Sequence, residues 1–172
     1  MLVSFHKPDT GMRYRSRFVR ADGLTIELDG GGYNKVGTGR VPHDLAHLLV
    51  EDTLGLDDGL WGVLARGGMF DHCTVLAGRR APHAARRAQA VVDAAGPGLA
   101  YAELAVRAVS DVALAGDLGD LDALRRSSAL FASVSVDVDA ATLTSACLRL
   151  RDAAAEWDAI PPGGTLTASW PT

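Results

Sequence analysis

Strict alternation of side-chain character near the N-terminus constrains the fold of this chain more than any other feature. Residues 12–20 place Tyr14, Ser16 and Phe18 on one face and arginines on the other, and residues 24–29 repeat the two-residue period. Such a period is typical of strands with one buried face. We therefore expect the N-terminal region to form an antiparallel hairpin whose inner face packs on a core.

The chemistry of the paired side chains indicates the register of this hairpin. A three-residue loop at residues 21–23, with its glycine in the left-handed conformation, pairs Phe18 with Ile26 on the inner face. The same register matches Arg17 with Glu27 on the outer face. A two-residue turn would instead place Arg17 opposite a leucine, so the longer loop is favoured.

Other segments complete an α+β fold. Alternation at residues 2–6 and 165–170 predicts two further strands, so the sheet combines N-terminal strands with a C-terminal strand. The valines at 134, 136 and 138 indicate another short strand. Helical periodicity, caps and stops predict about five helices packed against this sheet. They cover residues 42–54, 59–65, 82–95, 99–115 and a final helix capped by Asp139, and Asp120 could cap a shorter one.

The final helix carries one apolar stripe, formed by residues 143, 147, 150, 154 and 157, and we expect it to lie across the sheet. The glycine-rich segment 30–39 lacks the lysine of a phosphate-binding loop. It is expected to form a turn over the start of the 42–54 helix.

Composition restricts the class of protein. The 172 residues, 48% of them hydrophobic, fit one domain spanning residues 1–172. A net charge of -4 offers no general attraction to nucleic acids or anionic membranes. Cys73 and Cys147 form no CxxC pair, which indicates a reducing compartment. With no signal-type segment and no long apolar run, we expect a cytoplasmic protein.

The helix predicted at residues 42–54 carries the clearest chemical signal. At about 100° per residue, His43, His47 and Glu51 share one polar stripe on an otherwise apolar cylinder. Imidazoles four residues apart are separated by about 6 Å along the axis, so both can bind one divalent ion such as Zn²⁺. Glu51 lies about 12 Å from His43 along the axis, too far to join the same ion without strain.

A third metal ligand would therefore come from another segment. The sequence offers four candidates: Asp71, His72, His83 and His6. We take His72 as the third metal ligand, with Asp44 and Glu51 as the catalytic carboxylates or as supports for the histidines.

The order His43-Asp44-x-x-His47 resembles the His-Glu-x-x-His helix of zinc metallopeptidases. That resemblance implies zinc binding by the two histidines and a general-base role for Asp44, whose carboxylate is one methylene shorter than glutamate. A family of ubiquinone-synthesis proteins also begins such a helix with His-Asp-x-x-His, but its later glutamate corresponds to Gly59 here. The wider pattern Val-Pro-His-Asp-Leu-x-His, followed by Val-Glu, Leu-Gly-Leu and Leu-Trp-Gly, is similar to a family of small bacterial proteins of unknown function.

An arginine-rich turn provides a second candidate site. Arg79, Arg80 and His83 precede the helix predicted at residues 82–95, where free backbone N–H groups favour an anion such as phosphate or carboxylate. The alternative is that these side chains are solvated or paired with acids.

Two functional hypotheses follow from these patterns. The first is a metal-dependent hydrolase, with one zinc-like ion, that acts on a small polar or anionic substrate. The second is a noncatalytic ligand-binding or interaction domain in which His43 and His47 are hydrogen-bonded structural residues. A homodimer formed through Leu60, Trp61 and the helix from Leu99 would fit the second hypothesis.

Overall fold

The α+β prediction is confirmed. The computed structural model describes residues 1–10, 13–36, 39–115, 129–134 and 138–171. Its strands are β1 (Leu2–His6), β2 (Arg15–Val19), β3 (Thr25–Asp29), β4 (Tyr33–Val36), β5 (Gly39–Pro42), β6 (Cys73–Ala77) and β7 (Thr165–Ser169). Its helices are α1 (His43–Leu54), α2 (Leu60–Ala65), α3 (Ala84–Ala95), α4 (Pro97–Ala113), α6 (Ala129–Val134) and α7 (Ala140–Ala159).

The first hairpin has the predicted register. Phe18 lies opposite Ile26 and Arg17 opposite Glu27, and Gly23 closes the loop with a φ of 81°. Glu27 also accepts a second salt bridge, from Arg15, so this carboxylate lies beneath two guanidinium groups on the outer face. The alternation of the sequence was sufficient to predict the register, because only this pairing puts apolar residues on one face and opposite charges on the other.

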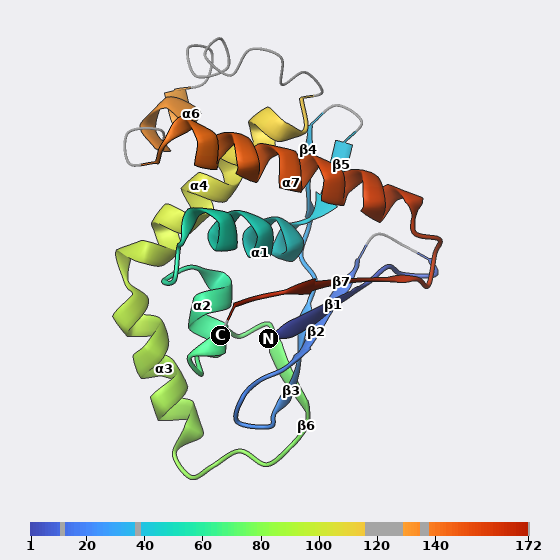
Figure 1. Cartoon of the computed structure of the whole chain (residues 1–172). Coiled ribbons are helices and arrows are strands. Elements are labelled where there is room, and N and C mark those ends of the chain that lie inside the picture. The colour runs from blue at the N-terminus through green and yellow to red at the C-terminus, as the bar shows by residue number, and fades with distance from the viewer. Residues whose placement is uncertain (11–12, 37–38, 116–128, 135–137, 172) are drawn as a thin grey trace.

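Strands from the two ends of the chain pair with each other in the sheet. The antiparallel sheet has the order β6-β3-β2-β1-β7, so β1 pairs with β2 on one side and with the C-terminal β7 on the other. The two termini consequently lie close together (Figure 1). The edge strand β6 comes from the middle of the chain and was not predicted, because apolar residues occupy both of its faces: Val75 is half-buried, whereas Leu76 on the opposite face is exposed.

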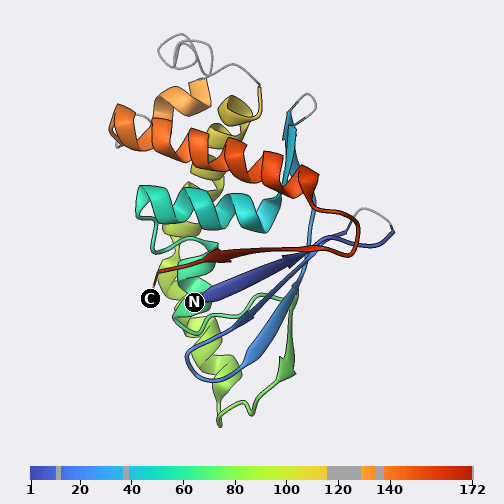
Figure 2. The same ribbon diagram turned by 45° about the vertical axis from the view of Figure 1, so that its right-hand side comes forward.

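The helices gather on one side of the sheet (Figures 1 and 2). Helix α1 is the central one: it contacts α4, α7 and α2, and its apolar side chains reach the sheet. Helix α7 has the predicted cap and buried stripe. It packs on α1, α4 and β5 rather than across the sheet, which corrects our expectation. The reason is that α1 already occupies the sheet face.

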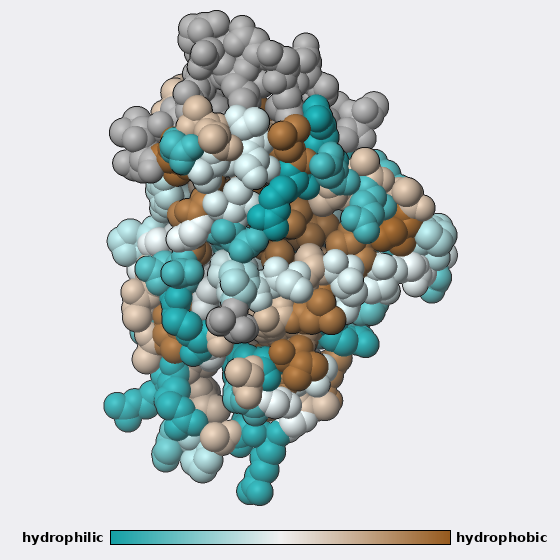
Figure 3. Space-filling model, viewed as in Figure 1, coloured by the Kyte–Doolittle hydropathy of each residue, from teal (hydrophilic) through white to brown (hydrophobic). Residues whose placement is uncertain are grey.

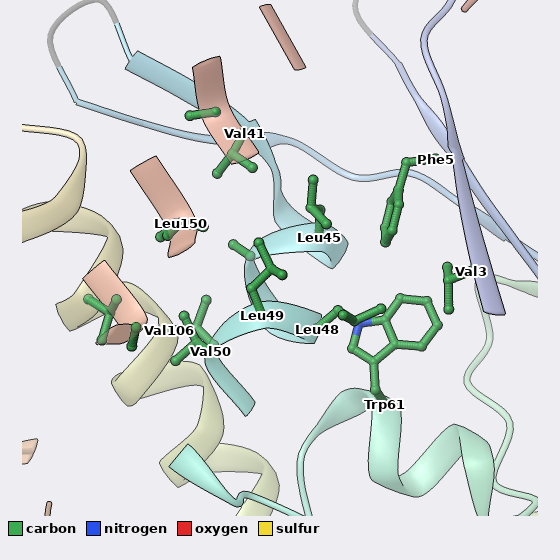
Figure 4. Close-up of a cluster of buried hydrophobic side chains, with 14 of the residues drawn as sticks. Val3, Phe5, Val41, Leu45, Leu48, Leu49, Val50, Trp61, Val106 and Leu150 are labelled. Carbon is green, nitrogen blue, oxygen red and sulfur yellow. The ribbon is translucent and has the colours of Figure 1, made fainter. Parts of the chain in front are cut away.

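The core between sheet and helices contains Trp61. Its ring packs edge-on against Phe5 and Phe18, close to Leu48 of α1 (Figure 4). The indole N–H donates to the backbone oxygen of Asp44. Trp61 is fully buried, so it does not contribute to the exposed apolar face that we proposed for a dimer.

Some hydrophobic side chains do reach the surface between α7 and β7, where they alternate with polar ones (Figure 3). A shallow groove of about 260 Å³ on this surface is bounded by Leu45, Leu166 and Arg149. Polar and apolar groups share this groove, so it is not the apolar face proposed for a dimer.

Three local predictions differ from the structure. The glycine-rich segment forms the β4–β5 hairpin, which nevertheless lies at the start of α1 as expected. Helix α3 begins at Ala84, two residues late, because His83 has a left-handed φ of 58°. Val134 ends helix α6 instead of beginning a strand. Asp120 and Val136, which belong to two of the predicted elements, lie outside the described residues.

Among the described residues, no helix combines the length and apolarity that crossing a bilayer requires.

Candidate metal centre

Helix α1 brings its two histidines together as the spacing predicts. The ring centroids of His43 and His47 are 4.5 Å apart, and the ring planes meet at 74°. His47 is almost fully buried, whereas His43 is about one-third exposed. The pair therefore lies at the edge of the core, on the side of α1 that faces α4.

Helix α4 supplies a carboxylate that the sequence analysis missed. Glu103 Oε1 lies 3.4 Å from His47 Nε2 and 3.6 Å from His43 Nε2. One potential ligand atom from each of these three residues falls within 4.8 Å of the others. His43, His47 and Glu103 therefore form a group that could hold a metal ion.

Hydrogen bonds behind the rings select the tautomer that exposes both Nε2 atoms. His47 Nδ1 lies 2.7 Å from Glu51 Oε1, a carboxylate oxygen that can only accept when ionised. His43 Nδ1 lies 2.8 Å from Asn34 Oδ1, and the amide of Asn34 is oriented because its Nδ2 donates to Ser110. With both Nδ1 atoms protonated, both Nε2 lone pairs are available on the side of Glu103.

One of these nitrogens has no hydrogen-bond partner. His47 Nε2 is buried and has no hydrogen-bond partner among the described residues. Its 3.4 Å contact with Glu103 Oε1 does not have the geometry of a hydrogen bond. Buried polar atoms are nearly always hydrogen-bonded, so an exception needs a physical reason. A cation between His47, His43 and Glu103 is one such reason.

Glu51 is a support for His47 rather than a free base. Its carboxylate accepts hydrogen bonds from the backbone N–H groups of Leu60 and Trp61, besides the contact with His47. The side chain is fully buried and fixes the start of α2 against α1. A Cβ at Gly59 would lie 2.3 Å from the carboxyl carbon of Glu51, so only glycine fits at this position.

Asp44 is turned away from the histidines. Its carboxylate accepts a hydrogen bond from Ser16 Oγ at 2.7 Å, and its backbone N–H donates to the hydroxyl of Tyr14. Asp44 is buried on the side of α1 that faces the sheet. The structure therefore does not bring this proposed base to the metal-binding group, although it is adjacent to His43 in sequence.

The three-residue group also has a distinctive electrostatic state in the absence of a metal. Burial lowers the pKa of His47, but the carboxylates of Glu103 and Glu51 outweigh burial and raise it to about 9. The neighbouring rings of His43 and His47 hold the pKa of Glu103 well below its usual range. The site thus attracts positive charge, which either a proton on His47 or a metal ion can provide.

The group opens into a pocket of about 300 Å³, here called the histidine pocket. Its lining residues are His47, Leu60, Phe70, His72, Leu99, Ala100 and Glu103. His72, our predicted third ligand, is exposed in this wall and lies outside the three-residue group. Its ring stacks on Phe70, with centroids 5.7 Å apart and an interplanar angle of 12°.

The predicted anion-binding residues lie elsewhere. Arg80 lines a second pocket of about 280 Å³, here called the arginine pocket, together with Arg20, Phe70 and Gln89. Arg79 and His83 are exposed in the same turn but are not in the wall of that pocket. The turn does not join the histidine pocket, so the structure shows no combined metal and arginine cleft among the described residues.

The other candidate ligands are also apart from the metal-binding group. His6 contacts Thr165 on the sheet, and Asp71 lines the arginine pocket.

Comparisons of the chain with models of known protein families, with curated proteins and with solved structures found no match. The interpretation of this site therefore depends on its geometry and chemistry.

Proposed function

We propose that the protein is a metal-dependent hydrolase that holds one zinc-like ion with His43, His47 and Glu103. The observation that carries this proposal is the buried His47 Nε2, which has no hydrogen-bond partner in the described part of the chain, while Nδ1 of the same ring is fixed by Glu51. A ring held from behind by a carboxylate, with its other nitrogen free, is the usual arrangement of a metal-binding histidine.

The chemistry of the donors fits a catalytic ion better than a structural one. Two imidazoles and one carboxylate suit Zn²⁺ and leave a fourth position for water or substrate. Bound there, the ion would lower the pKa of that water and polarise a substrate carbonyl. The pocket beside His47 and Glu103 gives a small molecule access to this position.

In this proposal, some of the protein's side chains orient the metal-binding rings and another transfers protons. Glu51 and Asn34 orient the two rings through their Nδ1 atoms. Glu51 and Asp44 are occupied by other hydrogen bonds, so neither is the proton acceptor. His72 is the further titratable side chain that the described pocket wall offers for proton transfer.

The competing hypothesis is a noncatalytic protein with a structural histidine pair. In that case a protonated His47 would bridge Glu51 and Glu103 permanently, and no metal would be required. In the first hypothesis a metal ion takes the place of the proton on His47 Nε2, whereas in the second the proton stays. Metal content therefore separates them directly.

The test is elemental analysis of protein purified without chelators, followed by calorimetric titration of the stripped protein with Zn²⁺. We expect near-stoichiometric metal in the wild type, and loss of binding in His47→Ala and Glu103→Ala. His83→Asn is the matched control, because it removes an imidazole outside the site and asparagine tolerates the left-handed backbone. A wild type that neither carries nor binds a divalent metal contradicts the proposal.

Hydrolysis is tested on the same proteins. Zinc-loaded wild type should cleave members of a panel of small esters and amides, and His47→Ala should lose this activity while His83→Asn keeps it. Metal binding without hydrolysis of any panel member would contradict the reaction class.

A further inference from the structure

We infer that the histidine pocket takes a compact, uncharged ester-like or amide-like molecule, whose polar group faces His47 and Glu103 and whose apolar body lies against Phe70 and Leu99. This inference deepens the proposed function and rests on it for the position of the polar group. It narrows the small polar or anionic substrate expected from the sequence to an uncharged one.

The wall of the pocket is the first support. Leu60, Phe70, Leu99 and Ala100 make up the apolar part of the wall, and His47, His72 and Glu103 are its polar members. A pocket of this composition binds ligands mainly by burying apolar surface and uses its few polar groups for orientation. The ligand should therefore have one polar end and one apolar body.

Charge is the second support. Among the described residues, no lysine or arginine lines the histidine pocket, and Glu103 brings a carboxylate to its polar end. Arg20 and Arg80 belong to the other side of Phe70. A carboxylate or phosphate on the apolar body would lose its hydration without gaining a cationic partner. The pocket consequently discriminates against anionic bodies.

Size and shape are the third support. A volume of about 300 Å³ corresponds to about ten non-hydrogen atoms, if each water-sized group takes roughly 30 Å³. Phe70 is half-buried, and its ring is nearly parallel to that of His72, so the wall contains two aromatic rings with a shared orientation. A planar body such as a phenyl ring can stack on such a ring. His72 also places a hydrogen-bonding group beside the ligand.

The experiment uses hydroxamates, which bind zinc through a polar end and differ only in their bodies. Calorimetry on zinc-loaded protein should show benzohydroxamate binding at least tenfold more tightly than acetohydroxamate. A 4-carboxybenzohydroxamate should bind at least tenfold more weakly than benzohydroxamate. Equal affinity for the phenyl and methyl compounds, or a preference for the carboxylated one, would overturn the inference.

Two variants locate the preference in the pocket. Leu99→Lys introduces a cation into the wall and should reverse the order of the phenyl and carboxyphenyl compounds. Leu104→Lys, on the same helix but half-exposed and outside the wall, is the matched control and should leave the order unchanged. Identical behaviour of the two variants would overturn the assignment of the body to this pocket.

A metal-independent arm separates this inference from the proposed function. Benzamide, but not benzoate, should shift the backbone amide resonances of Phe70 and Leu99 in zinc-free protein. If the chain binds no zinc but benzamide gives these shifts, the proposed function fails and the preference of the pocket for uncharged bodies stands. If zinc binds but neither benzamide nor benzohydroxamate is preferred, the inference fails and the metal site stands.

Discussion

The histidine pocket and the arginine pocket share Phe70 as a wall, yet they satisfy their buried charges in different ways. In the arginine pocket the nearly buried Arg20 is bonded to Asp22 and to the backbone oxygen of Gly68. In the histidine pocket the buried Nε2 of His47 has no hydrogen bond to any residue that the structure describes. Both pockets have similar volumes, so size does not distinguish them.

The two pockets therefore differ in whether a bound ligand is needed to satisfy a buried polar group. The guanidinium of Arg20 is satisfied by its own neighbours, so its burial is explained without a bound molecule. Among the described lining residues of the arginine pocket, Arg80 is the one exposed cation that could attract an anion. The unpartnered His47 nitrogen and two nearby carboxylates instead require a cation or a proton. We expect the strongest ligand effects at the histidine pocket and weak ones at the arginine pocket.

The largest effect should come from removing the carboxylate behind His47. Glu51→Ala leaves two buried backbone N–H groups and the His47 ring without their acceptor. We expect a loss of about 3–5 kcal/mol in the free energy of unfolding, and weaker zinc binding by about 10–100-fold in any protein that still folds. Urea unfolding and zinc titration measure these effects.

Asp52→Ala is the control for that prediction. Its carboxylate is on the same helix but pairs with the half-exposed Arg149, so its loss should cost less than about 1 kcal/mol. A similar cost for both substitutions would mean that Glu51 is an ordinary surface-like partner.

An intermediate effect should appear in the dependence of stability on pH. In the metal-free protein the folded state raises the pKa of His47 from 6.5 to about 9. The protonated form stabilises the fold, so this contribution is complete below pH 6.5 and is lost as the pH rises through 9. Between pH 6 and pH 8 the free energy of unfolding should fall by about 2 kcal/mol.

His47→Gln should abolish this slope, and the difference between the two proteins isolates His47 from other titrating groups. Zinc should reverse the sign, because metal binding requires the neutral ring and strengthens as the pH rises. If the free energy of unfolding of the wild type and of His47→Gln changed with pH in parallel, His47 would not be the titrating group, and the electrostatic contrast between the two pockets would be contradicted.

The smallest effect should be that of an anion at the arginine pocket. With a dissociation constant in the millimolar range, 10 mM phosphate (about five times that constant) should stabilise the protein by about 1 kcal/mol. The stabilisation should disappear in Arg80→Ala and persist in His47→Ala, as followed by thermal unfolding. Stabilisation that survives Arg80→Ala would place the anion outside this pocket.

Local patterns in the sequence were sufficient to predict those features that depend on the periodicity of a single segment. The β2–β3 register follows from alternation and charge pairing, and the cap and buried stripe of α7 follow from helical spacing. The approach of His43 and His47 is equally local, because a helix places residues four apart on one face. These features needed no knowledge of the rest of the fold.

The third donor and the roles of the carboxylates were decided by tertiary packing. Glu103 lies sixty positions along the chain from His43, and only the contact between α1 and α4 brings it to the histidines. A weak signal existed, since Glu103 is an acid next to the buried Ala102 on an amphipathic helix. Surface helices commonly carry such acids, so this signal did not single it out.

Local sequence patterns therefore predicted strands β1, β2, β3 and β7, the main helices and the paired histidines, because each follows from one repeating period or from interactions between near neighbours. They did not predict β6 or the β4–β5 hairpin. Tertiary structure decided that Glu51 supports His47, that Asp44 bonds to Ser16 and that Glu103 faces both rings. The physical reason is that helix periodicity fixes the direction of a side chain, whereas its partner depends on which element packs against that face.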